Sequence, residues 1–99
     1  MLNTFSVATF SPCVGQVFHA QFGDTVRAEL ALVEASPLGT DTDTRRARAP
    51  FRLMFRGPAG VVAPQAIYSL ENESLGQMEL FLVPISADAT GVTYEAVFT

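Results

Sequence analysis

The chain has 99 residues with ten acidic and six basic side chains, so its formal net charge is −4 at pH 7. This length fits one small domain, and the acidic balance disfavours nucleic acid as the main partner. Charged residues make up 16% of the chain and hydrophobic residues 48%, whereas charged residues reach about 25% in typical soluble domains. We therefore expect another chain, or a second copy, to cover part of the surface. An ordinary alanine-rich monomer is the alternative.

The N-terminal sequence MLNTFSVATF has neither the basic start nor the apolar stretch of a signal peptide. No segment approaches the roughly 18 uninterrupted apolar residues that a membrane-spanning helix needs. The single cysteine, Cys13, cannot form an internal disulfide. The sequence therefore predicts a cytoplasmic protein that is stabilised by packing, and incorporation into a particle stays open.

The first predicted element is a single helical turn at residues 11–15, within the sequence FSPCVG. Ser11 suits the N-cap, Pro12 the first helical position and Gly15 the end of the turn. Strands follow, because apolar and polar residues then alternate with a period of two. The second of these strands also permits a helix, but its helical apolar stripe is thin. The six predicted strands are 16–22, 25–35, 50–57, 66–72, 77–86 and 92–98.

Turn residues separate the predicted strands. Gly23 and Asp24 predict a hairpin turn between the first two, and residues 36–49 predict a long mobile loop, because no large apolar residue follows Leu38. The fifth strand is apolar on both faces at 80–83, which predicts a central position. The side chains expected to face the core include Phe18, Ala20, Phe22, Val26, Ala28, Leu30, Leu32, Phe51, Leu53, Phe55, Tyr68, Leu70, Val92, Tyr94, Ala96 and Phe98.

Six short strands with no helix beyond one turn predict an all-β fold, a small antiparallel six-stranded barrel or sandwich. Residues 1–99 are expected to form one β domain, interrupted by the loop at 36–49. The connections are too short for crossover helices, which favours antiparallel pairing. The sequence does not distinguish a barrel from a sandwich.

Candidate catalytic and metal-binding groups are sparse. Cys13 and His19 could act as nucleophile and base, but no third group orients either, so both are expected to be structural. Asp41 and Asp43 start like a calcium loop that lacks the central glycine and the terminal glutamate. We expect no enzyme activity, no cofactor and no metal.

Arginines are concentrated between residues 45 and 56, where five of the six lie. One interpretation is a site for an acidic partner, and a second is nucleic-acid binding. A third is internal pairing, in which strand arginines meet Glu79 or Glu95 across the sheet and loop arginines neutralise nearby aspartates. An exposed methionine on the same strand face favours contact with another chain. The candidate partner-binding residues are Arg45, Arg46, Arg48, Arg52, Met54 and Arg56.

Three blocks carry a resemblance to a known family: FRLMFRGP, QAIYSLE and MELFLVPI followed by YEAVF. They look like the FxLxFxGP, QxxYxLE and LELFLVPI…YEAVF blocks of a small bacterial family that is described as a domain of unknown function. The resemblance covers residues 49–98, with weaker similarity at FSPCVGQVF. Relatives are associated with phage-tail-collar-like proteins, so the resemblance implies an accessory or structural role. The blocks themselves hold strand alternation and turns, and no catalytic chemistry.

Together these observations favour a non-enzymatic protein-binding or assembly module. It would be an accessory or structural component of a phage-tail-like or other multi-protein assembly, with a protein partner or self-association. Its contacts would use an open strand edge or the face of Arg52, Met54 and Arg56. The alternative is a nucleic-acid-binding β-barrel that uses the stretch from Arg45 to Arg56.

Overall fold

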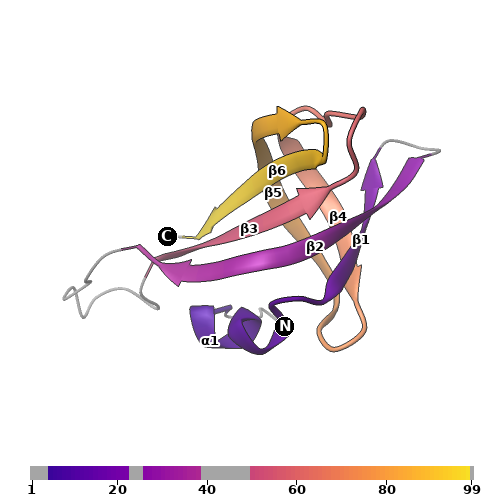
Figure 1. Cartoon of the computed structure of the whole chain (residues 1–99). Coiled ribbons are helices and arrows are strands. Elements are labelled where there is room, and N and C mark those ends of the chain that lie inside the picture. The colour runs from indigo at the N-terminus through magenta and orange to yellow at the C-terminus, as the bar shows by residue number, and fades with distance from the viewer. Residues whose placement is uncertain (1–4, 23–25, 39–49, 99) are drawn as a thin grey trace.

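The computed structural model describes residues 5–22, 26–38 and 50–98. Two short helical elements precede six strands, and Figure 1 shows their arrangement. The elements are the helix α1 (Val7–Phe10), the 3-10 turn η1 (Ser11–Cys13) and the strands β1 (Val17–Phe22), β2 (Val26–Pro37), β3 (Phe51–Gly57), β4 (Ala66–Asn72), β5 (Gly76–Asp88) and β6 (Gly91–Phe98).

The strands form a closed barrel in the order β1-β2-β3-β6-β5-β4, and every pairing is antiparallel. The predicted all-β antiparallel fold is confirmed, and the structure is a barrel. Each described strand pairs with a neighbour on both sides, so no whole strand lies at an open edge, although β1 and β4 share only two residue pairs.

Period-two alternation places the core as predicted on most strands. β3 illustrates this: Phe51, Leu53 and Phe55 are fully buried, whereas Arg52 and Met54 lie on the outer wall and are half-buried. The expected core residues of the other strands are also buried, apart from the half-buried Phe98 at the end of β6 and Val26, which is the first residue of β2 and is 46% exposed. Burial of so many phenylalanine and leucine side chains supplies most of the stabilisation, at about 1.5–3 kcal/mol for each fully buried side chain.

The helical segment begins earlier than the sequence predicted. α1 starts at Val7, after an N-cap at Ser6 whose backbone N–H donates to Thr9 Oγ1 at 3.1 Å. Ser11 is both the C-cap of α1 and the first residue of η1, and its hydroxyl donates to the Val7 carbonyl at 2.9 Å. The predicted helical turn is present at Ser11–Cys13, but it continues the preceding helix α1, which the sequence did not predict.

Phe10 explains why the N-terminal segment is helical. Its side chain is fully buried and its ring lies within 6.5 Å, centroid to centroid, of the rings of Phe18, Phe51 and Phe98. A short helix with so little intrinsic stability depends on this tertiary contact. In Figure 1, α1 lies across one end of the barrel, next to β2.

Two further expectations need correction. β2 continues through Ser36 and Pro37, which pair with Arg52 and Phe51, so the predicted loop cannot begin at residue 36. The outer face of β5 is not buried, because the side chain of Phe81 is 51% exposed. The rest of the predicted loop, residues 39–49, and the predicted turn at 23 and 24 lie outside the described residues.

Candidate functional site

Arg52, one of the predicted partner-binding residues, is paired within the chain. Its guanidinium reaches Glu34 Oε2 at 3.3 Å and Glu95 Oε2 at 3.5 Å, on the two strands that flank β3. The Ser36 hydroxyl donates to the same Glu34 carboxylate. This hydrogen bond, followed by the charge of Arg52, holds the pKa of Glu34 below its usual value against the opposing effect of desolvation.

Arg56 is also paired, at the end of the hairpin between β5 and β6. Its guanidinium donates to Asp88 Oδ1 at 2.6 Å, to Thr90 Oγ1 at 2.6 Å and to Thr93 Oγ1 at 2.8 Å. Asp88 Oδ1 additionally accepts from the Thr90 hydroxyl and backbone N–H and from the Gly91 N–H. Led by the hydrogen bonds from Thr90, these contacts lower the pKa of Asp88 to about 2.

Met54 lies between these two arginines on the outer wall and is half-buried, opposite Glu34 on β2 and Glu95 on β6. The face of Arg52, Met54 and Arg56 is therefore a network of internal ion pairs. Of the two acids expected as partners, Glu95 is confirmed, whereas neither strand arginine pairs with Glu79. The other predicted site residues, Arg45, Arg46 and Arg48, lie outside the described residues.

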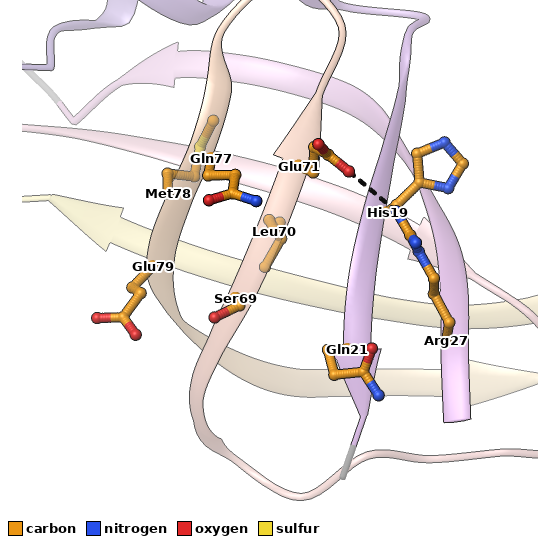
Figure 2. Close-up of a pocket in the computed structure, with 9 residues that line it drawn as sticks. All are labelled: His19, Gln21, Arg27, Ser69, Leu70, Glu71, Gln77, Met78 and Glu79. Atoms are coloured by element: carbon orange, nitrogen blue, oxygen red, sulfur yellow. Dashed lines mark hydrogen bonds and ion pairs between the residues drawn. The ribbon is translucent and has the colours of Figure 1, made fainter. Parts of the chain in front are cut away.

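The remaining described arginine, Arg27, bridges to Glu71 Oε1 at 3.0 Å. This pair lies on the outer wall beside His19, at an open hollow of about 560 Å3 over β1, β4 and β5 (Figure 2). His19 is opposite Glu29 on β2 and Glu71 on β4. All three described arginines thus have carboxylate partners, which leaves this part of the chain without an unpaired cationic arginine.

Cys13 and His19 point to different sides of the barrel wall. Cys13 is buried in the core cluster, whereas His19 lies between the buried Phe18 and Ala20 and faces the outer hollow. This arrangement does not present a nucleophile beside a base. Within the described ranges, no group of three or more His, Cys, Asp or Glu side chains could hold a metal ion.

An apolar pair on the outer wall was missed by the sequence analysis. Ile67 on β4 is directly opposite Phe81 on β5, and their side chains are 66% and 51% exposed. The next outward pair along the same strands is Ser69 and Glu79, both exposed. The sequence does contain a signal for this exposed pair, because Phe81 lies between Leu80 and Leu82 and so faces the opposite side of the strand. The sequence analysis missed it because the apolar run is unbroken, which suggested that both faces of the strand are buried. We call Ile67, Phe81, Ser69 and Glu79 the β4–β5 face.

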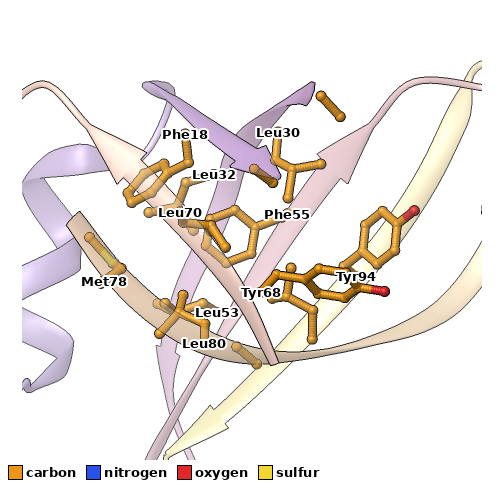
Figure 3. Packing of buried hydrophobic residues seen from close by; sticks show 14 of the residues in the cluster. Phe18, Leu30, Leu32, Leu53, Phe55, Tyr68, Leu70, Met78, Leu80 and Tyr94 are labelled. Carbon is orange, nitrogen blue, oxygen red and sulfur yellow. The ribbon is translucent and has the colours of Figure 1, made fainter. Parts of the chain in front are cut away.

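Two tyrosines hold the loop between β3 and β4 over the other end of the barrel. The Ala63 N–H donates to the Tyr94 hydroxyl at 3.0 Å, and the Tyr68 hydroxyl donates to the Pro64 carbonyl. Figure 3 shows both hydroxyls pointing the same way, away from the aliphatic side chains of the core. Desolvation, and then the neighbouring Tyr94, raise the pKa of Tyr68. The held loop exposes Val61 and Val62, whose side chains are 48% and 56% exposed.

These features define a class of protein: a small closed antiparallel barrel whose three described arginines are paired internally and which has an exposed apolar pair on one wall. The family described as "Domain of unknown function (DUF6916)" matches residues 5–98, and the chain belongs to this family. The predicted membership of an uncharacterised small domain family is confirmed, over a longer range than the blocks at 49–98. No curated protein and no solved structure gives a significant match.

The described part of the chain holds no helix with the length and apolar character that crossing a membrane would require.

Proposed function

We propose that the domain is a non-enzymatic protein-binding module that works as a component of a multi-protein assembly. The observation that carries this proposal is the cross-strand pair of Ile67 and Phe81, which leaves two large apolar side chains mostly in water. Exposed apolar groups that adjoin one another are typical of surfaces that another protein covers. The aromatic ring is a residue type enriched at such interfaces.

The setting of this pair supports a protein partner. The barrel wall around it is rigid, because β4 and β5 are joined through seven consecutive residue pairs from Ala66 and Leu82 to Asn72 and Gly76. A partner that binds a rigid strand face does not have to order the backbone of the barrel, so binding loses less conformational entropy. The adjacent Glu79 adds a charge that has no ion-pair partner among the described residues, so the β4–β5 face combines apolar contact with a specific polar one.

The face of Arg52, Met54 and Arg56 is a weaker candidate for the same role. Both arginines already have carboxylates at 2.6–3.5 Å, and a partner would have to compete with these contacts. Nucleic-acid binding through Arg52 and Arg56 of the stretch from Arg45 to Arg56 is weaker for the same reason, since electrostatic binding of phosphates needs unpaired cations. The phenylalanines of this stretch, Phe51 and Phe55, are buried in the core and cannot stack on bases.

The proposal also names the kind of assembly in which the domain would work. The association of the resembling family with phage-tail-collar-like proteins favours an accessory or structural component of a phage-tail-like particle. The inward-facing thiol of Cys13 and the outward-facing imidazole of His19 support a role without catalysis.

Affinity purification of the tagged protein from its source cells tests the proposal. It should be done at low and at high salt, with the variants Phe81→Ser and Val33→Ser. Val33 is 51% exposed like Phe81, but it lies on β2, three strands from β5 in either direction around the barrel. We expect protein partners that persist at high salt and are lost with Phe81→Ser but not with Val33→Ser. Recovery of nothing but salt-sensitive nucleic acid would overturn the proposal.

A further inference from the structure

The seam between β1 and β4 opens before either strand ends. Its ladder holds two residue pairs and stops at Ala20 and Leu70. Within the described part of the chain, β1 continues to Phe22 and β4 begins at Ala66. On its other side β4 pairs with β5 along its whole length, so its backbone is held in place there. We call residues 66–69 the open edge of β4, because this stretch has no ladder partner among the described residues of β1.

The open edge of β4 borders the outer hollow of about 560 Å3. Ser69 lines this hollow from β4 and Gln21 lines it from β1, and Figure 2 shows the two strands diverging towards these residues. On the inner side of the seam, the rings of Phe22 and Tyr68 meet at 5.0 Å, centroid to centroid, and both side chains are 8% exposed. The core is therefore closed beneath the gap, and the seam is accessible from outside.

A strand edge of this kind recognises an extended backbone. Its N–H and C=O groups can pair with those of a second chain, whose alternate side chains then lie on the outer wall. The edge of a second barrel would meet β1, which lies beside the open edge at Gln21 and Phe22. A single extended segment fits the gap better, because it brings no folded wall with it.

The side chains around the open edge indicate what such a segment should carry. Ile67 is 66% exposed, the largest value for a bulky apolar side chain in the described ranges, and the described ladders give it a neighbour on β5 and none on β1. A side chain of an added strand would cover this free side. The next outward side chain of the added strand would lie beside Ser69, over the hollow. The hollow is lined by two carboxylates and one guanidinium, those of Glu71, Glu79 and Arg27, so a basic side chain fits there better than an acidic one.

We propose that the open edge of β4 binds an extended segment of a partner protein as an added strand, with an apolar side chain beside Ile67 and a basic side chain over the hollow. This inference rests on the proposed function and deepens it by naming the form in which the partner binds. The main chain of the segment would supply affinity, and its two outward side chains would supply specificity.

Hydrogen exchange of the free full chain tests whether the edge is open. The neighbouring amides of Ile67 and Tyr68 point to opposite sides of β4, so one faces β5 and the other faces β1. We expect the amide that faces β1 to exchange about a hundredfold faster. Leu53 and Met54 on β3 pair on both sides and should both exchange slowly. Equal protection of Ile67 and Tyr68 would overturn the inference.

Selection from a displayed library of random linear peptides, with the purified full chain as target, tests binding. Ser69→Trp fills the hollow beside the open edge, Val33→Trp on the outer wall of β2 is the matched control, and circular dichroism checks that both variants are folded. We expect the enriched peptides to combine apolar and basic residues at alternate positions and to slow exchange of the amide that faces β1. They should bind Ser69→Trp about tenfold more weakly than Val33→Trp. Failure to enrich any peptide, or equal binding to the two variants, would overturn the inference.

The proposed function fails separately. If a protein partner is lost with Phe81→Ser but kept with Ser69→Trp, the protein-binding role stands and strand addition is wrong. If peptides bind the open edge while Phe81→Ser loses no protein partner, strand addition stands and the apolar pair does not carry the proposed function.

Discussion

The side-chain amide of Asn72 donates to the backbone carbonyl of Val17 at 3.1 Å and closes the barrel at its shortest seam. β1 and β4 share only two ladder pairs, His19 with Glu71 and Ala20 with Leu70. Asn72 is 2% exposed, and its oxygen accepts from the backbone N–H groups of Ser74 and Leu75 in the following turn. One buried side chain thus joins the β4–β5 turn to β1.

Asn72→Ala should destabilise the protein by about 1–3 kcal/mol, because it leaves the partly buried Val17 carbonyl and the Ser74 and Leu75 N–H groups without this partner. For a domain of this size each kcal/mol corresponds to a fall in Tm of roughly 4–8 °C. Ser69→Ala, on the exposed side of the same strand, serves as the control and should change stability by less than about 0.5 kcal/mol. Equal Tm values for the two variants would show that the amide does not close the seam.

Gly57 at the end of β3 has no room for a side chain. A Cβ there would lie 2.6 Å from Leu30 Cδ2 and 3.2 Å from Tyr94 Cε2, inside the packed core. We expect Gly57→Ala to cost about 1–3 kcal/mol through overpacking, measured by urea unfolding. The double variant Gly57→Ala with Leu30→Val should lose less than the sum of the two single effects, because the shorter side chain removes the clash. Strict additivity would contradict this explanation.

Asp88 should make stability depend on pH in the acid range. Its pKa is lowered from 3.8 to about 2 in the folded chain, so the unfolded state binds a proton more readily. The stabilisation is therefore complete above pH 4–5 and is lost as the pH falls towards 2. The difference in unfolding free energy between the unmodified chain and Asp88→Asn should shrink over this interval. A difference that stays constant down to pH 2 would rule out this role.

The Tyr94 hydroxyl should protect one particular amide from exchange. It accepts from the N–H of Ala63 at 3.0 Å, at a position that is 4% exposed. Tyr94→Phe removes the acceptor at a cost of about 1 kcal/mol and should raise the hydrogen-exchange rate of the Ala63 amide. Tyr68→Phe should leave that amide protected, because the Tyr68 hydroxyl bonds to Pro64 instead. Unchanged exchange in Tyr94→Phe would show that the loop is held by other contacts.

The sequence predicted those parts of the fold that depend on local alternation. Phe18, Phe55 and Tyr94 face the core because side chains on a strand alternate between its two sides. The position of α1 was not predictable in this way, because it depends on Phe10 reaching the rings of β1 and β3. The helix start at residue 7 is a consequence of that tertiary contact and has little local signal.

The candidate site was also predictable from the sequence only in part. Pairing of Arg52 with Glu95 was foreseeable as an option, since adjacent strands bring opposite charges together. The exposure of Phe81 was not, because the sequence cannot say which face of an apolar strand a barrel leaves to solvent. The interior of a closed barrel takes one face of each strand, and the outer face of β5 is left uncovered.

The most direct test of the central claim is site-specific photo-cross-linking in the source cells. A photoreactive amino acid would replace Phe81 in one variant and Val33 in another. We predict a discrete protein adduct from position 81 and none from position 33, with the mass of the adduct showing whether a second copy or a different protein is bound. Adducts from both positions alike, or from neither, would contradict the claim that the β4–β5 face is a protein-binding surface.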